Sequence, residues 1–520
     1  MKNFLLLSFI SGFLFVQAVS AQTVRGIVFE DINQNSKKDR KEKVLPNVAV
    51  SNGIDVVLTN NKGEYTLPVS DDNIIFVIKP SGYNVPVDQD NLPRYYYIHK
   101  PNGSPELKFK GVEATGPLPK SVDFGLTPTV EKDEFQILVF GDPQVYNEKE
   151  VEYFEKGIIT PLKNSTQYAF GISLGDLVGN KPTLFNPYIQ AVKQIGIPWY
   201  QVMGNHDMNF DVTSDTLSDE SFEAHFGPNN YAFNYGKVHF IVLDDIIYQG
   251  PHAKRPYIGG LRKDQLDFVE NSLKYVPKDH LIVISAHIPF VNGNNGIRKE
   301  DNQRLFSILK DYPHTFSMSA HTHIQKQIFI GKGHGWKQEE PHHHYNVGTT
   351  SGNWYSGEFN ELGIPYATMS DGTLKGWAAV TFKGNQYELD YHVAGKPADF
   401  KMNVFLPKVV QKRKSPNTSV YVNYFLGGER DTVYYRVDSG KWQKMTRTET
   451  QDPHLLLSVF KWDTSDTLLR GSRPRDPNIS THIWKASVPA DLPVGEHTME
   501  FRVNDMFGRK FYSTATYRVE

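Results

Sequence analysis

Five short runs in the middle of the chain are strand candidates, and each stops at a turn that carries an Asp, Asn or His side chain. Segments of helical length separate most of the runs, a rhythm typical of βαβ units and of a mostly parallel sheet. In such a sheet the carboxyl ends of the strands meet along one edge, where α/β proteins place their chemistry. The pattern therefore predicts a central α/β domain with polar side chains gathered at one edge. The runs are residues 135–140, 170–174, 199–202, 281–285 and 315–319.

The polar turns form an ordered set of metal-type ligands. Each turn alone has an ordinary explanation, since Asp and Asn are common at helix caps and in turns. Together they supply two carboxylates, one amide and three imidazoles, enough to hold two divalent ions that share one carboxylate. We therefore expect a dinuclear metal site at this edge. The turns are Gly141-Asp142-Pro143-Gln144, Gly175-Asp176, Gly204-Asn205-His206-Asp207, Ala286-His287 and Ala320-His321-Thr322-His323.

This order of motifs resembles the calcineurin-like metallophosphoesterase superfamily. The family pattern is Asp-x-His, Gly-Asp, Gly-Asn-His-(Asp/Glu), a later His and Gly-His-x-His, and the resemblance covers about residues 135–392. It implies a two-sheet α/β sandwich with a first metal held by Asp142, Asp176 and His323. Asp176 would bridge to a second metal, whose other ligands would be Asn205, His287 and His321.

Two positions depart from the family pattern. Gln144 stands where the family usually has His, so the first metal would gain at best a neutral oxygen ligand and bind more loosely, or be a harder ion such as Mn²⁺. Ala320 stands where the last block usually has Gly, a small change that we expect to be tolerated. Gly179 replaces the Tyr that purple acid phosphatases use as an iron ligand, so we expect no chromophore of that type.

The resemblance implies hydrolysis of phosphoesters by a hydroxide that bridges two Mn, Fe or Zn ions. His206 would act as the acid that protonates the leaving oxygen, and we expect Asp207 to orient His206 without touching metal. A phosphodiester is slightly favoured over a phosphomonoester, because His206 suits leaving-group protonation. The alternatives are a nucleotide phosphatase or other phosphomonoesterase, and a non-catalytic binding protein with a degenerate metal site.

Two further segments lie close to these motifs in the sequence. The Gly-rich turn 349–357 carries Trp354 and Tyr355, which we expect to form a substrate wall near the metal edge. The alternative is that these aromatic side chains pack against a neighbouring domain. The run His342-His343-His344 is interpreted as a polar loop ahead of a strand rather than as a third metal site.

Regions without helical periodicity flank the α/β segment. Residues 22–125 and 400–520 alternate apolar and polar residues between turn signals, which predicts a β-sandwich on each side of a catalytic domain at 134–396. The first resembles the carboxypeptidase-regulatory-like sandwiches of exported proteins, and a linker is expected at 117–132. The expected fold class is therefore multidomain, with a central α/β sandwich between two all-β domains. These would dock on the catalytic domain or on a surface partner.

The N-terminal region also contains a candidate calcium loop. Five oxygen-bearing side chains fall at positions 1, 3, 5, 9 and 12 of an EF-hand-like spacing. Position 6 is Ser36 where Gly is expected, and Lys37 and Lys38 add positive charge, so a solvated charged turn is the alternative. The candidate ligands are Asp31, Asn33, Asn35, Asp39 and Glu42.

The N-terminal segment and the composition indicate where the protein functions and which chemistries it lacks. Residues 1–21 have a positive start, an apolar core and a small-residue cleavage site, which predicts a signal peptide and export to the periplasm or the extracellular space. No later apolar run reaches membrane-spanning length, so no transmembrane segment is expected in the mature chain. The absence of cysteine excludes disulfides, thiolate ligands and a cysteine nucleophile. A formal net charge of -2 argues against a nucleic-acid scaffold and favours a small phosphoester substrate.

Overall fold

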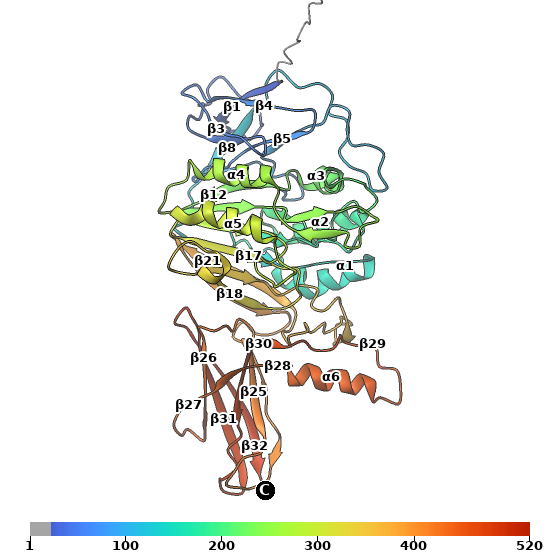
Figure 1. The fold of residues 1–520 in the computed structure, drawn as a ribbon, viewed down its shortest axis with the longest axis vertical. Coiled ribbons are helices and arrows are strands. Elements are labelled where there is room, and N and C mark those ends of the chain that lie inside the picture. The colour runs from blue at the N-terminus through green and yellow to red at the C-terminus, as the bar shows by residue number, and fades with distance from the viewer. Residues whose placement is uncertain (1–21) are drawn as a thin grey trace, which may run out of the picture.

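The computed structural model describes residues 22–520 and shows three regions stacked along the long axis (Figure 1). An all-β region lies at the N-terminal end, an α/β region in the middle and a second mainly β region at the C-terminal end. The expected fold class, a central α/β sandwich between two β domains, is confirmed. The predicted signal peptide, residues 1–21, lies outside the described residues.

Two sheets build the central region. In the first sheet the strand order is β11-β10-β9-β21-β22, and β9, β10 and β11 run parallel to one another. In the second the order is β12-β13-β16-β17-β19-β18, and the four inner strands are parallel. The first sheet comprises β9 (Glu134–Phe140), β10 (Phe170–Leu174), β11 (Trp199–Val202), β21 (Gly376–Lys383) and β22 (Gln386–Val393). The second comprises β12 (Tyr231–Tyr235), β13 (Val238–Val242), β16 (Leu281–Ser285), β17 (Thr315–Ser319), β18 (Lys326–Ile330) and β19 (His342–Asn346).

Strand β9 shows how the sequence pattern positions these sheets. Ile137 and Val139 join the main core, which also takes in side chains of the second sheet, whereas Leu138 and Phe140 join a separate core with helices α1 and α2. Successive side chains point to opposite faces, so a strand covered on both faces favours apolar residues at successive positions. The helices of the region are α1 (Glu148–Phe154), α2 (Phe185–Val192), α3 (Glu220–Phe226), α4 (Lys263–Leu273) and α5 (Lys299–Ile308).

The interpretation of the histidine run as a polar loop is wrong. His342, His343 and His344 belong to strand β19 and are buried. The neighbouring strand β17 makes this possible, because the Ser317 hydroxyl lies 2.6 Å from both His342 Nε2 and His344 Nδ1. These hydrogen bonds replace the water that the imidazoles lose, so the run is structural rather than a third metal site.

The N-terminal region consists of two four-stranded sheets that pack on the α/β region. Lys79 Nζ pairs with Glu131 at 2.6 Å and donates to the Asn234 carbonyl, and the Phe76 ring lies 5.6 Å from the Phe268 ring of α4. One sheet comprises β1 (Thr23–Glu30), β4 (Glu64–Pro68), β6 (Tyr83–Asn84) and β8 (Phe124–Pro128), and the other β2 (Ala49–Ser51), β3 (Val56–Leu58), β5 (Asn73–Val77) and β7 (Tyr96–His99).

Hydrogen bonds within the loop close the candidate calcium segment. Asp31 accepts the backbone N–H groups of Asn35 and Ser36, and the Lys38 ammonium donates to the backbone carbonyls of Asp39 and Glu42. A loop closed by its own hydrogen bonds is compatible both with a calcium-binding loop and with a charged turn. The calcium site therefore stays a prediction.

The C-terminal region contains a helix that the all-β prediction missed, α6 (Pro453–Asp463). Asp452 caps it by accepting the Leu455 N–H at 2.9 Å, and the Asp-Pro pair is a recognised helix-start signal. One sheet comprises β23 (Met402–Phe405), β25 (Ser419–Tyr424), β28 (Thr446–Thr450) and β30 (Ser480–Ser487). The other comprises β24 (Val409–Val410), β26 (Thr432–Val437), β27 (Gln443–Lys444), β31 (Gly495–Asn504) and β32 (Lys510–Val519).

The C-terminal region is joined to the α/β region by buried polar contacts. His482 Nε2 lies 3.0 Å from Asp371 Oδ2 with both side chains about 1% exposed, and Asn423 Nδ2 donates to the Asp371 carbonyl. A two-stranded ladder adds to this junction, since β29 (Gly471–Ser472) pairs with β20 (Gly357–Glu358). A second short ladder, β14 (Ile246–Tyr248) with β15 (Tyr257–Gly259), lies within the α/β region.

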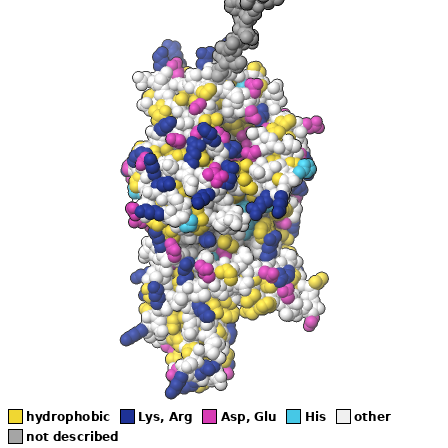
Figure 2. Space-filling view, viewed as in Figure 1, with side chains coloured by type: hydrophobic (Ala, Val, Ile, Leu, Met, Phe, Trp, Pro, Cys, Tyr) yellow, Lys and Arg dark blue, Asp and Glu magenta, His cyan; other side chains and the backbone are white. Residues whose placement is uncertain are grey.

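The surface carries both signs of charge. Lys and Arg are interspersed with Asp and Glu over the face seen in Figure 2, as the formal net charge of -2 suggests. No helix within residues 22–520 has the combined length and apolar character that a membrane span requires.

Candidate metal centre

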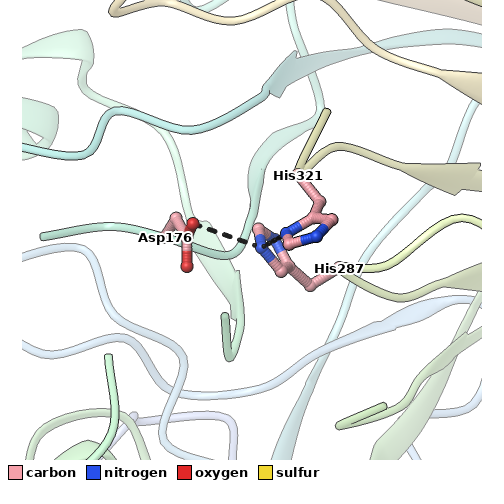
Figure 3. Close-up of side chains that lie close together, drawn as sticks. All are labelled: Asp176, His287 and His321. Atoms are coloured by element: carbon pink, nitrogen blue, oxygen red, sulfur yellow. Dashed lines mark hydrogen bonds and ion pairs between the residues drawn. The ribbon is translucent and has the colours of Figure 1, made fainter. Parts of the chain in front are cut away.

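The carboxyl ends of the central strands bring the predicted ligands together. His287 Nε2 lies 3.3 Å from Asp176 Oδ2, 3.1 Å from Asn205 Oδ1 and 3.2 Å from His321 Nδ1. Figure 3 shows Asp176, His287 and His321 pointing toward one another from three different strand ends, with ligand atoms within 4.8 Å of one another. Four residues that are far apart in the sequence thus form one cluster of candidate metal ligands. They are the four residues that the sequence predicts as ligands of the second metal.

A second group of candidate metal ligands also lies next to Asp176. His323 Nε2 is 3.6 Å from Asp142 Oδ1, and Gln144 Nε2 is 3.3 Å from Asp176 Oδ2. Within the described residues, the buried atoms Asp142 Oδ1 and Gln144 Oε1 have no hydrogen-bond donor. A buried acceptor without a donor is costly, and a bound cation would remove that cost. Asp176 therefore contacts two groups of candidate ligands that both suit a divalent ion.

Hydrogen bonds to backbone carbonyls orient two of the imidazoles. His287 Nδ1 lies 2.7 Å from the Leu174 carbonyl, and His323 Nδ1 lies 2.7 Å from the Gly352 carbonyl. A carbonyl can only accept, so Nδ1 carries a proton in both rings and Nε2 is the nitrogen that faces the other ligands. This arrangement is typical of metal-ligating histidines.

Five of the predicted ligands sit in the left-handed backbone region. A non-glycine residue rarely adopts this region, and the strain costs on the order of 1–2 kcal/mol per residue. Such strain accumulates at functional sites, where the surrounding structure holds it in place. The φ angles are 36° at Asp142, 40° at Gln144, 49° at Asp176, 67° at His321 and 52° at His323.

Two glycines leave room for this convergence. A Cβ added at Gly204 would lie 2.1 Å from the Asp176 nitrogen and 2.4 Å from Asp176 Oδ1. At Gly175, where φ is 87°, a Cβ would lie 2.5 Å from His287 Nδ1. Any side chain at either position would push a ligand out of place.

Family models match three consecutive stretches of the chain. The N terminal of calcineurin-like phosphoesterase matches residues 32–113, calcineurin-like phosphoesterase matches 135–325, and the C terminal of calcineurin-like phosphoesterase matches 344–511. The chain belongs to the calcineurin-like phosphoesterases. The expected family is confirmed, and the central match covers the donor residues from Asp142 to His323, so the chain carries a metal-dependent phosphoesterase domain.

Solved structures offer more distant likenesses. A purple acid phosphatase, PPD1 from yellow lupin (Lupinus luteus), is 11% identical with a TM-score of 0.36, over 71% of this chain and 66% of that chain. This chain thus spans just under two thirds of the lupin protein. A cold-active protein-tyrosine phosphatase from the psychrophile Shewanella sp. is 10% identical with a TM-score of 0.22, over 66% and 98% of the two chains. TM-scores this low do not establish a shared fold. No curated protein matches the chain.

Electrostatics within this phosphoesterase centre favour neutral imidazoles at His321 and His323 and an ionised carboxylate at Asp176. Burial lowers the pKa of His321 to about 3 and that of His323 to about 4, so both have lone pairs available at neutral pH. Burial acts to raise the pKa of Asp176, but His287 and His206 outweigh it and hold this pKa below its usual range. Burial raises the pKa of Asp142 well above its usual value.

His287 carries a proton that compensates for the carboxylates. Burial alone would lower its pKa, but Asp176, Asp142 and Asp245 together raise it to about 10. A divalent cation between the same carboxylates supplies the positive charge instead, so metal binding would release this proton.

The structure corrects the role expected for Asp207. His206 Nδ1 lies 2.7 Å from Asn180 Oδ1, so Asn180 orients the His206 ring. The buried Asp207 carboxylate instead accepts the backbone N–H groups of Gly204 and Val178, at 2.9 and 3.1 Å. Its pKa rises to about 8, chiefly through burial. Asp207 therefore braces the two ligand turns against each other and does not orient His206.

Asn180 is the site residue that sequence reasoning missed. It closes the stretch Gly175-Asp176-Leu177-Val178-Gly179-Asn180, four residues after the bridging carboxylate. Its position in the same turn as Asp176 was the signal that could have identified it as a site residue. Its partner could not be predicted in this way, because His206 lies at the end of the next strand.

Of the two aromatic residues only Trp354 lies at the metal edge, and its ring also packs against Arg475 of the C-terminal region at 3.7 Å, as the alternative expected. The Trp354 ring stacks on His323 at 4.0 Å between centroids and 21° between planes, so it lies at the metal edge. Tyr355 is 6% exposed, and its hydroxyl donates to the Pro143 carbonyl at 2.7 Å. The expectation for Tyr355 is therefore wrong, because this residue supports the Asp142 turn from within the core.

Proposed function

We propose that this protein hydrolyses phosphoesters with two divalent metal ions. The observation that carries the proposal is that Asp176 contacts both groups of buried candidate ligands, His287 in one and Gln144 in the other. The group with Gln144 also contains buried oxygen atoms, Asp142 Oδ1 and Gln144 Oε1, that have no hydrogen-bond donor within the described residues. Asp142, Gln144 and His323 would hold the first ion, and Asn205, His287 and His321 the second, with Asp176 shared. The neutral oxygen of Gln144 favours a hard ion such as Mn²⁺ in the first position, while Fe or Zn suits the imidazole-rich second position.

When bound, two divalent ions neutralise the phosphoester charge and lower the pKa of a water molecule that serves as nucleophile. The protein's own residues set the geometry of the reaction. The backbone N–H of His206 donates to Asp176 Oδ1 at 2.7 Å, which holds the residue next to the bridging carboxylate. Asn180 holds Nδ1, so Nε2 is the atom from which protonated His206 can give a proton to the leaving oxygen.

The proposed substrate is a small phosphodiester. An alcohol leaving group gains most from protonation, which is the role proposed for His206. A phosphomonoester, including a nucleotide, is the alternative within the same chemistry. The sequence of residues 1–21 supports the further proposal that the protein is exported to the periplasm or the extracellular space.

The test measures metal content and turnover of the full chain. Bis(4-nitrophenyl) phosphate and 4-nitrophenyl phosphate are supplied with Mn²⁺, Zn²⁺ or Fe²⁺, and we expect two bound ions and faster release of nitrophenol from the diester. Asp176→Asn should lower turnover by roughly a thousandfold, because the shared carboxylate is lost. Asp311→Asn, a change at an exposed Asp of the same domain, is the control. Normal turnover by Asp176→Asn would overturn the mechanism, and absence of both metal and turnover in the unmodified protein would favour a binding protein.

A further inference from the structure

The C-terminal region reaches the metal centre through one segment, residues 464–479, which we call the strap. It connects α6 to β30 and lies beside the α/β region, where β29 pairs with β20 (Figure 1). Just before the strap, the Lys461 ammonium of α6 pairs with Glu358 at 2.7 Å, and at its end the Asn478 N–H donates to the Ser370 carbonyl at 2.8 Å. The strap is therefore held against the catalytic domain at both ends and in between.

Arg475 of the strap completes a layered stack on a metal ligand. Its guanidinium carbon lies 3.7 Å from the centre of the Trp354 ring, and that ring stacks on His323 at 4.0 Å. A ring stacked so closely occupies one face of the indole, so Arg475 takes the other face. A planar guanidinium on an indole keeps its N–H groups free at the edges. The stack therefore fixes the position of Arg475 without using its hydrogen-bond donors.

The charge of Arg475 is not neutralised by a carboxylate. Arg473, two residues earlier, binds Asp463 and Asp476 through its guanidinium. Within the described residues, by contrast, Arg475 has no hydrogen bond or ion pair, and its side chain is exposed. A fixed guanidinium with free donors next to a phosphoryl site is a ready partner for an anion.

We propose that Arg475 determines specificity by binding a second anionic group of the substrate. This inference rests on the proposed function and names its substrate class: phosphoesters that carry a carboxylate or a further phosphate beyond the reacting phosphorus. One indole ring separates the guanidinium from His323, so Arg475 meets a group further along the substrate rather than the phosphoryl group between the metals. A bidentate pair with a carboxylate or phosphate is the interaction for which Arg is suited.

The test compares two ligands that differ in one charge. Propylphosphonate and 3-phosphonopropionate are titrated calorimetrically into the metal-loaded full chain. We expect 3-phosphonopropionate to bind the unmodified protein about tenfold more tightly, equivalent to about 1.4 kcal/mol. Arg475→Ala should abolish this difference while leaving propylphosphonate affinity and metal content unchanged, and Arg475→Lys should retain part of it. The matched control is Arg470→Ala, which removes an exposed charge from the same strap and should keep the full difference.

The outcomes separate this inference from the proposed function. Equal binding of the two phosphonates by the unmodified protein, or a preference that survives Arg475→Ala, would overturn the role of Arg475. Turnover of the nitrophenyl esters in the same preparation would leave the proposed function intact in that case. Conversely, a preference that depends on Arg475 in a protein without turnover would retain the anion site and reject the hydrolase.

Discussion

Asn180 Oδ1 lies 2.7 Å from His206 Nδ1, and this hydrogen bond joins the turn after β10 to the turn after β11. The backbone N–H of the same histidine donates to Asp176 Oδ1. The proposed acid is thus held at two points, one on its ring and one on its backbone. Because the amide oxygen accepts the Nδ1 proton, Nε2 is the atom available for proton transfer.

Asn180→Ala tests this positioning role. We expect kcat to fall about tenfold to a hundredfold for esters with poor leaving groups, and less for nitrophenyl esters, because a freely rotating ring rarely presents its proton. Metal content should not change, since within residues 22–520 the hydrogen bonds of Asn180 go to His206, which is not a proposed metal ligand. Asn180→Asp keeps an acceptor, so it should restore part of the activity and shift the pH profile upward by favouring the protonated ring. Equal losses for all leaving groups would instead indicate a purely structural role.

Gly204→Ala should displace the bridging carboxylate. The added methyl would lie 2.1 Å from the Asp176 nitrogen, a contact that backbone groups cannot absorb without moving. We expect fewer than two bound metal ions per chain and turnover at least tenfold lower. Gly331→Ala is the matched control, because a Cβ there meets nothing within 4 Å. Full metal content in Gly204→Ala would show that the turn has more freedom than the structure indicates.

Gln144→His should strengthen the first metal position. The Gln144 side chain is buried, and within the described residues its Oε1 has no hydrogen-bond donor. An imidazole at the same place supplies a stronger donor for Zn²⁺ or Fe²⁺ than a neutral amide oxygen. We expect about tenfold tighter binding of the weaker Zn²⁺ ion in a competition titration with a chelator, and weaker binding in Gln144→Leu. If both variants bind metal as the unmodified protein does, Gln144 is not a ligand.

His343→Phe should make the protein less sensitive to acid. Burial lowers the pKa of His343 from 6.5 to about 3, so between these values the unfolded chain binds a proton that the folded chain does not. The free energy of unfolding therefore falls as the pH falls from 6.5 toward 3, by about 1.4 kcal/mol per pH unit for this group. Phe removes that dependence and can keep the stack on Phe329, where the rings now lie 4.8 Å apart.

The measurement is denaturant unfolding at several pH values between 7 and 5. The unfolding free energy of His343→Phe should decline less steeply than that of the unmodified protein, whereas His252→Phe, at an exposed histidine, should keep the original slope. Identical slopes for all three proteins would mean that His343 is protonated in the folded state.

The sequence by itself determined the elements that carry the site. The runs at 170–174, 281–285 and 315–319 became β10, β16 and β17 with the predicted bounds, because their apolar residues are bounded by turn signals. The candidate metal ligands can also be found in the local sequence, since each one directly follows its strand. Sequence therefore predicted which residues would meet, and the structure places Asp176, Asn205, His287 and His321 in one cluster.

Only the tertiary structure decided which partners these residues contact. Asn180 replaced Asp207 as the partner of His206, Tyr355 turned into the core, and His342 to His344 became a buried strand supported by Ser317. Arg475 lies more than a hundred residues beyond Trp354 in the chain, and nothing local to residues 464–479 indicates that they reach the metal centre. The hydrophobic periodicity of the sequence predicts on which face of its helix or strand a residue lies. Which residue it contacts on that face depends on how segments distant in the sequence pack together.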